Sequence, residues 1–158
     1  MSTIDNKLQQ MGLELPEPPR PVAAYVPTVR TGNLVFVSGQ VPRERGEMKY
    51  RGHLGANLSL EDGRAAARLC ALNALSAVKQ EIGDLGRIRR VVKVTGFVAS
   101  AAGFTDQPKV VDGASLFLAE LLGEKGIHAR AAVGVNELPL GAAVELEMIV
   151  EVESEPRA

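Results

Sequence analysis

The fold is decided by Gly126–Glu153, which reads GIHARAAVGVNELPLGAAVELEMIVEVE. Two runs in this stretch alternate in the way that β-strands do, and they flank a Leu-Pro-Leu-Gly turn. The first run contains a single arginine, Arg130, among Ala, Val and Gly, and the second carries a row of glutamates. The stretch predicts two strands of a sheet and leaves open what a lone arginine does in one of them.

The segments that precede these strands predict a mixed sheet with two helices. The expected order is two strands around residues 31–33, a third strand near Met48–Arg51, a helix over 57–86, a strand over 87–100, a helix over 105–126 and the two final strands. Gly96 interrupts the fourth strand and predicts a bulge there. The result is an α+β fold with a sheet of about six strands and both helices packed on one face.

Both helices carry the signals expected at their ends and on their buried faces. Ser59 and Asp62 form a capping box at the start of the first helix, and Gly83 can end it. The second helix should end at Gly123 or Gly126. Its apolar face is expected to contain Val110, Ala114, Phe117, Leu118 and Leu121.

The N-terminus differs from the rest of the chain. Residues 1–18 predict an extension, made of a short amphipathic helix capped by Ser2 or Thr3 and of a proline-rich connector. Residues 19–158 predict one domain, and 158 residues are enough to form a real core.

One face of the predicted sheet has no helix to cover it. The strands carry small and apolar residues on that side, and no further helix is expected. Burial against other copies of the chain is the simplest remedy, so we expect an oligomer.

Charge and cysteine content narrow the classes of function. Lys and Arg total 18 against 19 Asp and Glu, a net charge of -1, whereas nucleic-acid binding usually needs a basic surface. Cys70 is the only cysteine, so no disulfide can form within the chain, as is typical of a reducing compartment. With no secretory signal and no apolar run of membrane-spanning length, we expect a soluble, cytoplasmic protein with no membrane partner.

Most residue types that carry chemistry have a structural explanation here. Cys70 lies in the middle of a helix among Ala and Leu, which predicts a buried, inert thiol. His53 and His128 lack the companion ligands that a metal site needs. The glycines do not have the spacing of a nucleotide-binding loop, so we expect neither a metal nor a cofactor.

Arg130 is different, because alternation places it on one face with His128, Ala132 and Gly134. Small neighbours leave room for a ligand, and the planar guanidinium fork suits a carboxylate. The alternative is a structural salt bridge, with Glu145 or Glu147 as its partner. A simple hairpin would put Glu145 roughly 13 Å along the strand from the partner of Arg130. A shared site would then need a subunit boundary or a less simple topology.

Two segments resemble a known family. YVPTVRTGNLVFVSGQVP (residues 25–42) and ARAAVGVNELPLGAAVELEMIVEV (129–152) are similar to the reactive intermediate deaminase (Rid) family, also called YjgF-like or, in older naming, L-PSP endoribonuclease. The resemblance covers residues 19–153, and the residues at 14–27 and 113–135 are similar to a longer subfamily within it.

The resemblance implies a chorismate-mutase-like α+β fold and a homotrimer with three clefts between subunits. It also implies hydrolysis of enamine and imine intermediates, such as 2-aminoacrylate released by pyridoxal-phosphate enzymes, to 2-keto acids and ammonia. The family reaction needs no cofactor. The ligand expected in each cleft is therefore a small 2-imino or 2-keto acid.

Carried over by position, Arg130 matches the arginine that holds the substrate carboxylate, and Glu145 matches the glutamate that positions or activates water. The residues that match cleft-lining positions are Tyr25, Ser38, Gly39 and Ala132. His128 and Ala24 replace residues that are often proline in the better-studied members. His128 either joins the site or simply caps its strand.

The family resemblance leaves more than one function open. The main reading is an imine and enamine deaminase; the alternative is a trimer that binds a small metabolite, without turnover, in the same cleft. Endoribonuclease activity follows from the older family name. It is disfavoured by the near-neutral charge and by the few aromatic side chains, two Tyr and four Phe.

Overall fold

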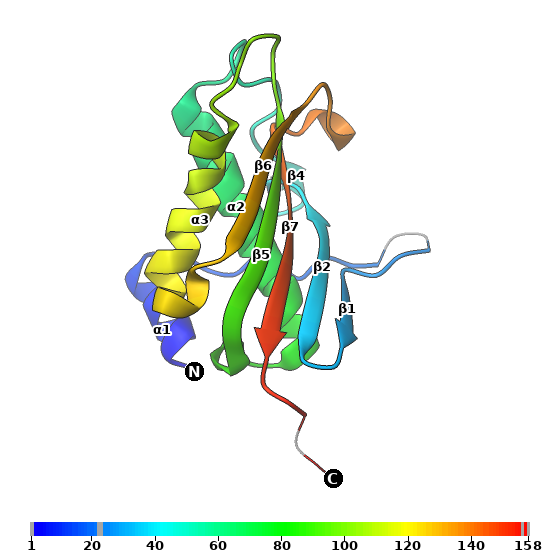
Figure 1. Ribbon diagram of the computed structural model, residues 1–158, viewed down its shortest axis with the longest axis vertical. Coiled ribbons are helices and arrows are strands. Elements are labelled where there is room, and N and C mark those ends of the chain that lie inside the picture. The colour runs from blue at the N-terminus through cyan, green and yellow to red at the C-terminus, as the bar shows by residue number, and fades with distance from the viewer. Residues whose placement is uncertain (1, 22–23, 156, 158) are drawn as a thin grey trace.

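One mixed sheet of five strands organises the protein (Figure 1). The computed structural model describes residues 2–21, 24–155 and 157. The strands in spatial order are β1 (Thr28–Thr31), β2 (Leu34–Gln40), β7 (Val144–Val152), β5 (Ile88–Ala99) and β6 (Ala129–Val135). Only β5 and β6 are parallel; the other neighbours are antiparallel. This confirms the α+β class with a mixed sheet.

Two long helices cover one face of the sheet, as expected (Figure 1). They are α2 (Leu60–Ile82) and α3 (Gln107–Leu122). Ser59 and Asp62 form the predicted capping box, and Gly83 and Gly123 end the two helices. Short 3-10 turns, η1 (Leu85–Arg87), η2 (Gly123–Gly126) and η3 (Pro139–Gly141), link the elements. Within the described residues, no helix combines the length and apolar character needed to cross a membrane.

The core lies between these helices and the sheet. The predicted apolar face of α3 is buried at all five positions, and Cys70 of α2 is buried as expected. The strands contribute the alternate residues that face the helices, among them Val35, Val91, Val94, Leu146, Met148 and Val150. Burial of this apolar surface is the main force that holds helices and sheet together.

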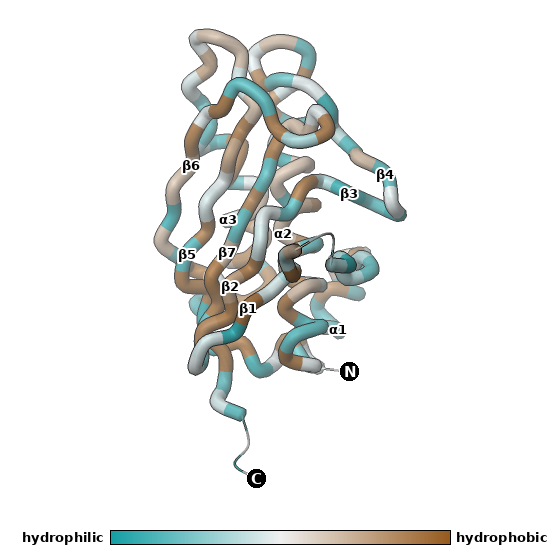
Figure 2. The backbone as a smooth tube through the Cα atoms, turned by 90° about the vertical axis from the view of Figure 1, so that its right-hand side faces the viewer, coloured by the Kyte–Doolittle hydropathy of each residue, from teal (hydrophilic) through white to brown (hydrophobic). Residues whose placement is uncertain are grey.

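The expectation of a sixth strand in the sheet was wrong. Residues 43–48 instead form a separate hairpin, β3 (Arg43–Glu44) with β4 (Glu47–Met48), which projects from the sheet in Figure 2. Its turn places Arg45 and Gly46 at positive φ, the geometry of a tight two-residue hairpin. Positive φ values at Tyr50 and Gly52 then interrupt the extended backbone, so the chain cannot continue as a strand.

The two final strands exist, but the simple hairpin between them does not. β5 lies between β6 and β7 and pairs with both. The reason is the parallel pairing of β5 with β6, which requires a crossover, and α3 supplies it. The turn at η3 therefore joins strands that are not neighbours.

Gly96 does not mark the predicted bulge. Its pairing with β6 is continuous, and the irregularities between β5 and β7 fall between Ile88 and Lys93. A Cβ at Gly96 would lie 2.5 Å from Cγ2 of Val111 on α3. The glycine is thus explained by the close approach of the helix to the sheet.

The N-terminal extension packs against the helices. α1 (Thr3–Gln10) is capped by Ser2, as predicted, and buries Leu8. Lys79 of α2 donates to Asp5 at 2.7 Å, and this contact lowers the pKa of the Asp5 carboxyl. The hydroxyl of Ser76 donates to the carbonyl of Pro16 at 2.6 Å. Both contacts fasten residues 2–21 to α2.

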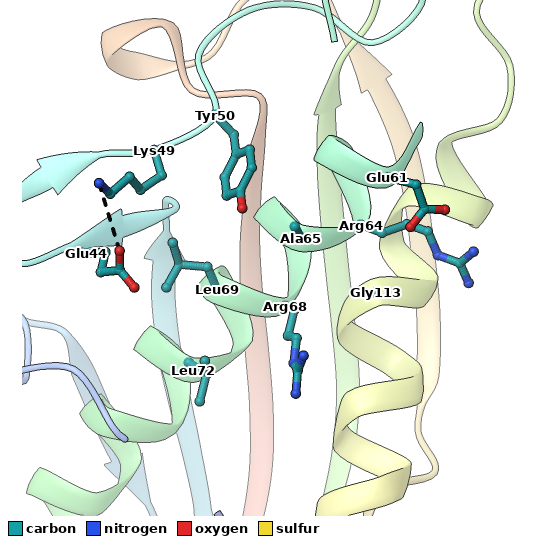
Figure 3. Close-up of a pocket in the computed structure, with 10 residues that line it drawn as sticks. All are labelled: Glu44, Lys49, Tyr50, Glu61, Arg64, Ala65, Arg68, Leu69, Leu72 and Gly113. Carbon is teal, nitrogen blue, oxygen red and sulfur yellow. Dashed lines mark ion pairs between the residues drawn. The ribbon is translucent and has the colours of Figure 1, made fainter. Parts of the chain in front are cut away.

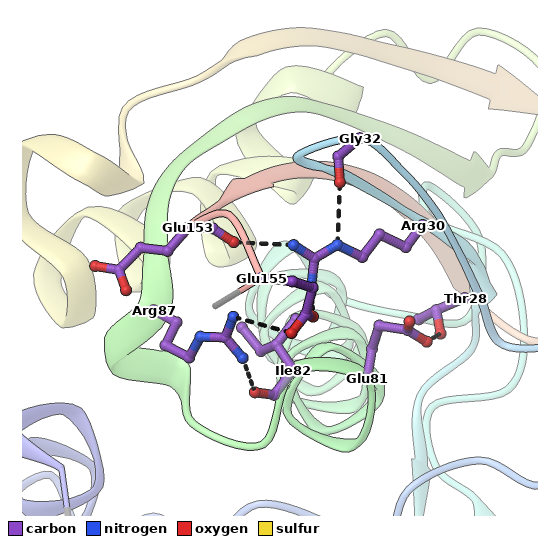
Figure 4. A network of polar contacts seen from close by, with 8 residues as sticks. All are labelled: Thr28, Arg30, Gly32, Glu81, Ile82, Arg87, Glu153 and Glu155. Atoms are coloured by element: carbon purple, nitrogen blue, oxygen red, sulfur yellow. Dashed lines mark hydrogen bonds and ion pairs between the residues drawn. The ribbon is translucent and has the colours of Figure 1, made fainter. Parts of the chain in front are cut away.

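Arg30 holds residues 153–155 against the β1–β2 hairpin (Figure 4). Its guanidinium donates to the carbonyl oxygens of Gly32, at 3.0 Å, and Glu153, at 2.9 Å, and it pairs with the carboxylate of Glu155. Arg87 lies 3.8 Å from the same carboxylate. These contacts fix the register at the end of β7.

The opposite face of the sheet is open in the single chain. Val29, Phe36 and Val133 are each more than 40% exposed there, although they belong to strands that are otherwise packed. Exposed apolar residues on one face of a sheet are typical of an interface. Association of copies through this face remains a prediction.

Replacing Gly113 by alanine tests how closely α2 and α3 approach. A Cβ at Gly113 would lie 2.1 Å from the backbone oxygen of Arg64, which cannot move without the helix. We expect Gly113→Ala to lower the free energy of unfolding by about 1–3 kcal/mol. An unhindered helical glycine would instead gain up to about 1 kcal/mol from the same change. Urea unfolding measures the difference.

Gly63→Ala is the matched control, because the new methyl would meet only side-chain atoms, the nearest being Cδ1 of Leu54 at 2.8 Å. It should cost less than Gly113→Ala. A Gly113→Ala protein as stable as the wild type would show that the helices are not in contact there.

Candidate functional site

Arg130 is held by α3 through one of its nitrogens. In the sheet it is aligned with Val94 and Met148, both buried under the helices, so its side chain leaves the sheet on the helical side. Its Nη1 donates to Oδ1 of Asp112 at 2.8 Å and to Oγ of Ser115 at 3.2 Å. The predicted salt-bridge alternative is thus realised, but with Asp112 rather than a glutamate of β7.

The other edge of the same guanidinium has no partner among the residues that the structure describes. Hydrogen bonds and the ion pair all use Nη1, which leaves Nε and Nη2 unused. The side chain is 24% exposed, so this edge is accessible in part. Nε and Nη2 of an arginine form the parallel pair of donors that fits a carboxylate. The geometry therefore suits the binding of an anion.

A hydrogen-bond chain continues from Arg130 to His128. Nδ1 of His128 lies 2.6 Å from the carbonyl oxygen of Gly126, which can only accept, so Nδ1 carries the proton. Nε2 of the neutral ring then accepts from the Ser115 hydroxyl at 2.9 Å. Burial lowers the pKa of His128, the bond to Gly126 opposes this, and the charge of Arg130 lowers the pKa further.

Helix α3 positions this cluster because its faces are sharply divided. Val111, Ala114 and Leu118 are buried in the core. Asp112 and Ser115, three residues apart, share the neighbouring face and reach the edge strand β6.

Glu145 lies on the opposite side of the sheet. Its neighbours in β7, Val144 and Leu146, are fully buried under the helices, so Glu145 points to the open face. A Cβ at Gly39 would lie 2.2 Å from Oε1 of Glu145, which means that the carboxyl group rests directly over this glycine. Burial raises the pKa of the Glu145 carboxyl, and the charge of Glu147 raises it further.

Ser38 and Gly39 belong to the irregular end of β2. The register between β2 and β7 shifts between Val37 and Gln40, which brings Gly39 beside Glu145. The backbone N–H of Ser38 donates to Pro27 at 2.9 Å, and the Gln40 amide donates to the Ser38 carbonyl at 3.2 Å. The local fold thus clears space for a carboxyl group.

Within one chain, Arg130 and Glu145 do not share a site. β5 separates their strands, and Glu145 lies three residues along β7 from Met148, the residue aligned with Arg130. Two strand spacings and three residues separate their Cα atoms by roughly 14 Å. Because the two side chains also leave opposite faces, a common site requires a second copy of the chain.

The open face carries a groove of about 420 Å³. Its lining includes Val26, Val29, Phe36, Ser38, Thr95 and Glu147. Tyr25, the residue before Val26 in the chain, is 59% exposed and lies just before the β1–β2 hairpin. Tyr25, Ser38, Gly39 and Glu145 are thus on or near β1, β2 and β7, whereas Arg130 and Ala132 lie on β6 and His128 directly precedes it.

Sequence reasoning missed Asp112 and Ser115. Both are polar residues on a helix that is otherwise apolar, and their spacing places them on one face. That spacing could have marked them as a polar pair, but the solvent-exposed face of any helix shows the same spacing. Only the structure shows that both side chains accept hydrogen bonds from Arg130.

A second groove, of about 630 Å³, crosses the outer face of α2 (Figure 3). Lys49 points towards Glu44, 3.9 Å away, whereas Arg64 and Arg68 point in different directions. The Arg68 guanidinium lies over the ring of Phe117, with 5.3 Å from Cζ to the ring centroid. The charged groups do not converge on one point, so this groove lacks the geometry of the Arg130 cluster.

Cys70 fits its predicted role as an inert thiol. Its Sγ lies 3.6 Å from the carbonyl oxygen of Val144, and burial, then the charge of Glu145, raises the thiol pKa well above its usual value. Among the described residues, no three His, Cys, Asp or Glu side chains are grouped so that they could hold a metal ion.

Comparison with known proteins identifies the family. Residues 5–152 match the family described as "YjgF/chorismate_mutase-like, putative endoribonuclease". Because the match spans nearly the whole chain, the protein belongs to this Rid/YjgF-like family.

Similar proteins come from distant organisms. Protein TCP17 of Trypanosoma cruzi is 45% identical over 92% of this chain and 91% of its own. A 2-iminobutanoate/2-iminopropanoate deaminase of Dermatophagoides farinae is 30% identical over 89% of this chain and 95% of its own. The crystal structure of a protein of unknown function from Agrobacterium tumefaciens is 46% identical, with a TM-score of 0.90, and the alignment covers 95% and 92% of the two chains.

Replacing Glu145 by glutamine tests the environment of this carboxyl group. A group whose pKa is raised on folding contributes stability below its unfolded pKa and loses that contribution as the pH rises through the folded pKa. Glu145→Gln should therefore be more stable than the wild type at pH 7, and the difference should shrink towards pH 4. Urea unfolding across this range measures it.

Glu151→Gln, on the same strand and face, is the control and should show no such gain, because it removes the partner of the Arg90 guanidinium, which lies 3.9 Å from the Glu151 carboxylate. Equal pH profiles for Glu145→Gln and the wild type would contradict the raised pKa.

Proposed function

We propose that the protein hydrolyses small 2-imino acids and their enamine tautomers to 2-keto acids and ammonia. The observation that carries this proposal is the guanidinium of Arg130, which is held through Nη1 and whose Nε–Nη2 edge has no partner among residues 2–21, 24–155 and 157. Membership of the Rid/YjgF-like family and the 30% identity to a 2-iminobutanoate/2-iminopropanoate deaminase support the same reaction.

Arg130 would bind the substrate carboxylate. Two parallel charged hydrogen bonds fix both the position and the orientation of a small acid, and the imine carbon next to the carboxylate is then fixed as well. Ala132, two residues along the same face of β6, leaves space beside the guanidinium.

Glu145 would handle the protons. Water adds to the imine carbon while its proton passes to the Glu145 carboxylate, and the same carboxyl group then protonates the nitrogen. The carboxylate next takes the proton of the new hydroxyl group and passes it to the amine, so the C–N bond breaks, ammonia leaves and the carbonyl of the keto acid forms. A carboxyl group whose pKa is raised by burial can accept and donate this proton closer to neutral pH than an ordinary glutamate.

The site would lie between subunits. Arg130 and Glu145 leave opposite faces of one chain, and the open face offers exposed apolar residues for association. A cyclic trimer brings β6 of each copy to the open face of the next and closes on itself, with three equal clefts. His128 would lie behind Arg130, whereas Tyr25, Ser38 and Gly39 would line the Glu145 side of the cleft.

Removing the Arg130 side chain tests the anchor. For freshly generated 2-iminobutanoate, we expect Arg130→Ala to lower kcat/KM by roughly 10- to 100-fold, the effect of losing charged hydrogen bonds. Arg130→Lys keeps the charge without the fork and should fall in between. Ammonia and 2-oxobutanoate release are the readouts.

Arg90→Ala is the matched control, since the Arg90 side chain is exposed and its guanidinium lies 3.9 Å from the carboxylate of Glu151 near the end of β7, outside the Arg130 cluster. Binding of 2-oxobutanoate without any acceleration of hydrolysis would favour the metabolite-binding alternative. Cleavage of RNA, without effect on imino acids, would instead favour the endoribonuclease alternative.

Mixing two variants of reduced activity tests whether the site is shared between subunits. The Arg130→Ala variant keeps an intact Glu145, and the Glu145→Gln variant keeps an intact Arg130. Unfolded and refolded together in equal amounts, they should recover about one quarter of the wild-type activity, because one adjacent pair in four combines both intact side chains. No recovery in mixed oligomers would place both groups within one chain.

A further inference from the structure

The α3 side of the carboxylate site contains two polar side chains that the proposed reaction does not use. We propose that Ser115 and His128 are positioning residues for Arg130, which hold its Nε–Nη2 edge towards the carboxylate of a 2-imino or 2-keto acid. This inference rests on the proposed function of the site. It adds that the guanidinium of Arg130 is held in its binding orientation before a ligand arrives.

Ser115 can accept from Arg130 because its only proton is used elsewhere. The hydroxyl donates to Nε2 of His128 at 2.9 Å, so the oxygen presents only lone pairs to Nη1 of Arg130, 3.2 Å away. Without His128, the hydroxyl proton could turn towards the guanidinium or towards a helix carbonyl.

His128 keeps this arrangement because Gly126 fixes its tautomer. The Gly126 carbonyl takes the Nδ1 proton at 2.6 Å, so Nε2 of the neutral ring is an acceptor that faces α3. Gly126 itself cannot carry a side chain, since a Cβ would lie 2.1 Å from the Leu118 backbone oxygen. The tight packing of η2 against α3 thus places the Gly126 carbonyl beside the imidazole of His128.

Asp112 completes the clamp, since Nη1 donates to it as well as to Ser115. Two acceptors on one nitrogen restrict the rotation of a long side chain that would otherwise lose considerable entropy on binding. A preorganised guanidinium binds its ligand more tightly for that reason.

Binding and turnover in Ser115→Ala provide the test, with 2-oxobutanoate as the ligand and 2-iminobutanoate as the substrate. We expect a Kd and a KM about tenfold higher and a kcat within twofold of the wild type, the result of losing one hydrogen bond to a charged group. Ser115→Thr keeps the hydroxyl and should restore both constants.

Ser76→Ala is the matched control, because it removes another helix-borne hydroxyl that donates to a carbonyl oxygen at 2.6 Å, far from Arg130 in the fold. It should lower stability and leave Kd and KM unchanged. The same pattern in Ser115→Ala would mean a structural role only and would overturn the proposal.

Nuclear magnetic resonance of the imidazoles gives an independent readout. The chain has two histidines, and His53→Gln assigns their signals. We expect the Nδ1-protonated tautomer for His128, with an Nε2 signal that reports an accepted hydrogen bond and changes in Ser115→Ala. The opposite tautomer, or an Nε2 signal that is the same in Ser115→Ala and the wild type, would contradict the chain of hydrogen bonds.

The two proposals fail in different ways. If 2-oxobutanoate binds to the wild type and is lost in Arg130→Ala, while Ser115→Ala behaves as the wild type, only the positioning role is overturned. If the wild type neither binds 2-oxobutanoate nor hydrolyses 2-iminobutanoate, the proposed function is overturned and the positioning role with it.

Discussion

The position of β5 between β6 and β7 is the constraint on which the rest of the structure depends. It follows from the parallel pairing of β5 with β6, which forces the chain to cross over through α3 before the next strand can form. The same arrangement separates Arg130 from Glu145 by two strand spacings and by the thickness of the sheet. A site that uses both residues can therefore exist only in an assembly.

The crossover also decides what each half of such a site looks like. Because α3 lies along β6, Arg130 emerges against Asp112 and Ser115 and is held before any ligand arrives. Glu145 emerges on the open face over Gly39, where partial burial raises its pKa. One half thus offers an oriented positive charge, and the other offers a carboxyl group suited to proton transfer.

Local signals in the sequence were sufficient for the helices and for most strands. The capping box at Ser59 and the apolar stripe of α3 depend only on residues close in the chain. The partners of β6 and β7 depend instead on a crossover that no turn motif encodes. In the sequence, Asp112 and Ser115 look like the ordinary solvent-exposed face of a helix until α3 is placed beside β6.

The central claim is that the free edge of Arg130 and the carboxyl of Glu145 from another copy face the same small acid. A crystal structure of the assembled protein with 2-oxobutanoate tests it most directly. The account predicts the ligand carboxylate on Nε and Nη2 of Arg130, with Glu145 of a neighbouring subunit close to the keto carbon. A ligand held away from Arg130 would contradict the account. So would an assembly in which Arg130 and Glu145 of neighbouring subunits do not face a common cleft.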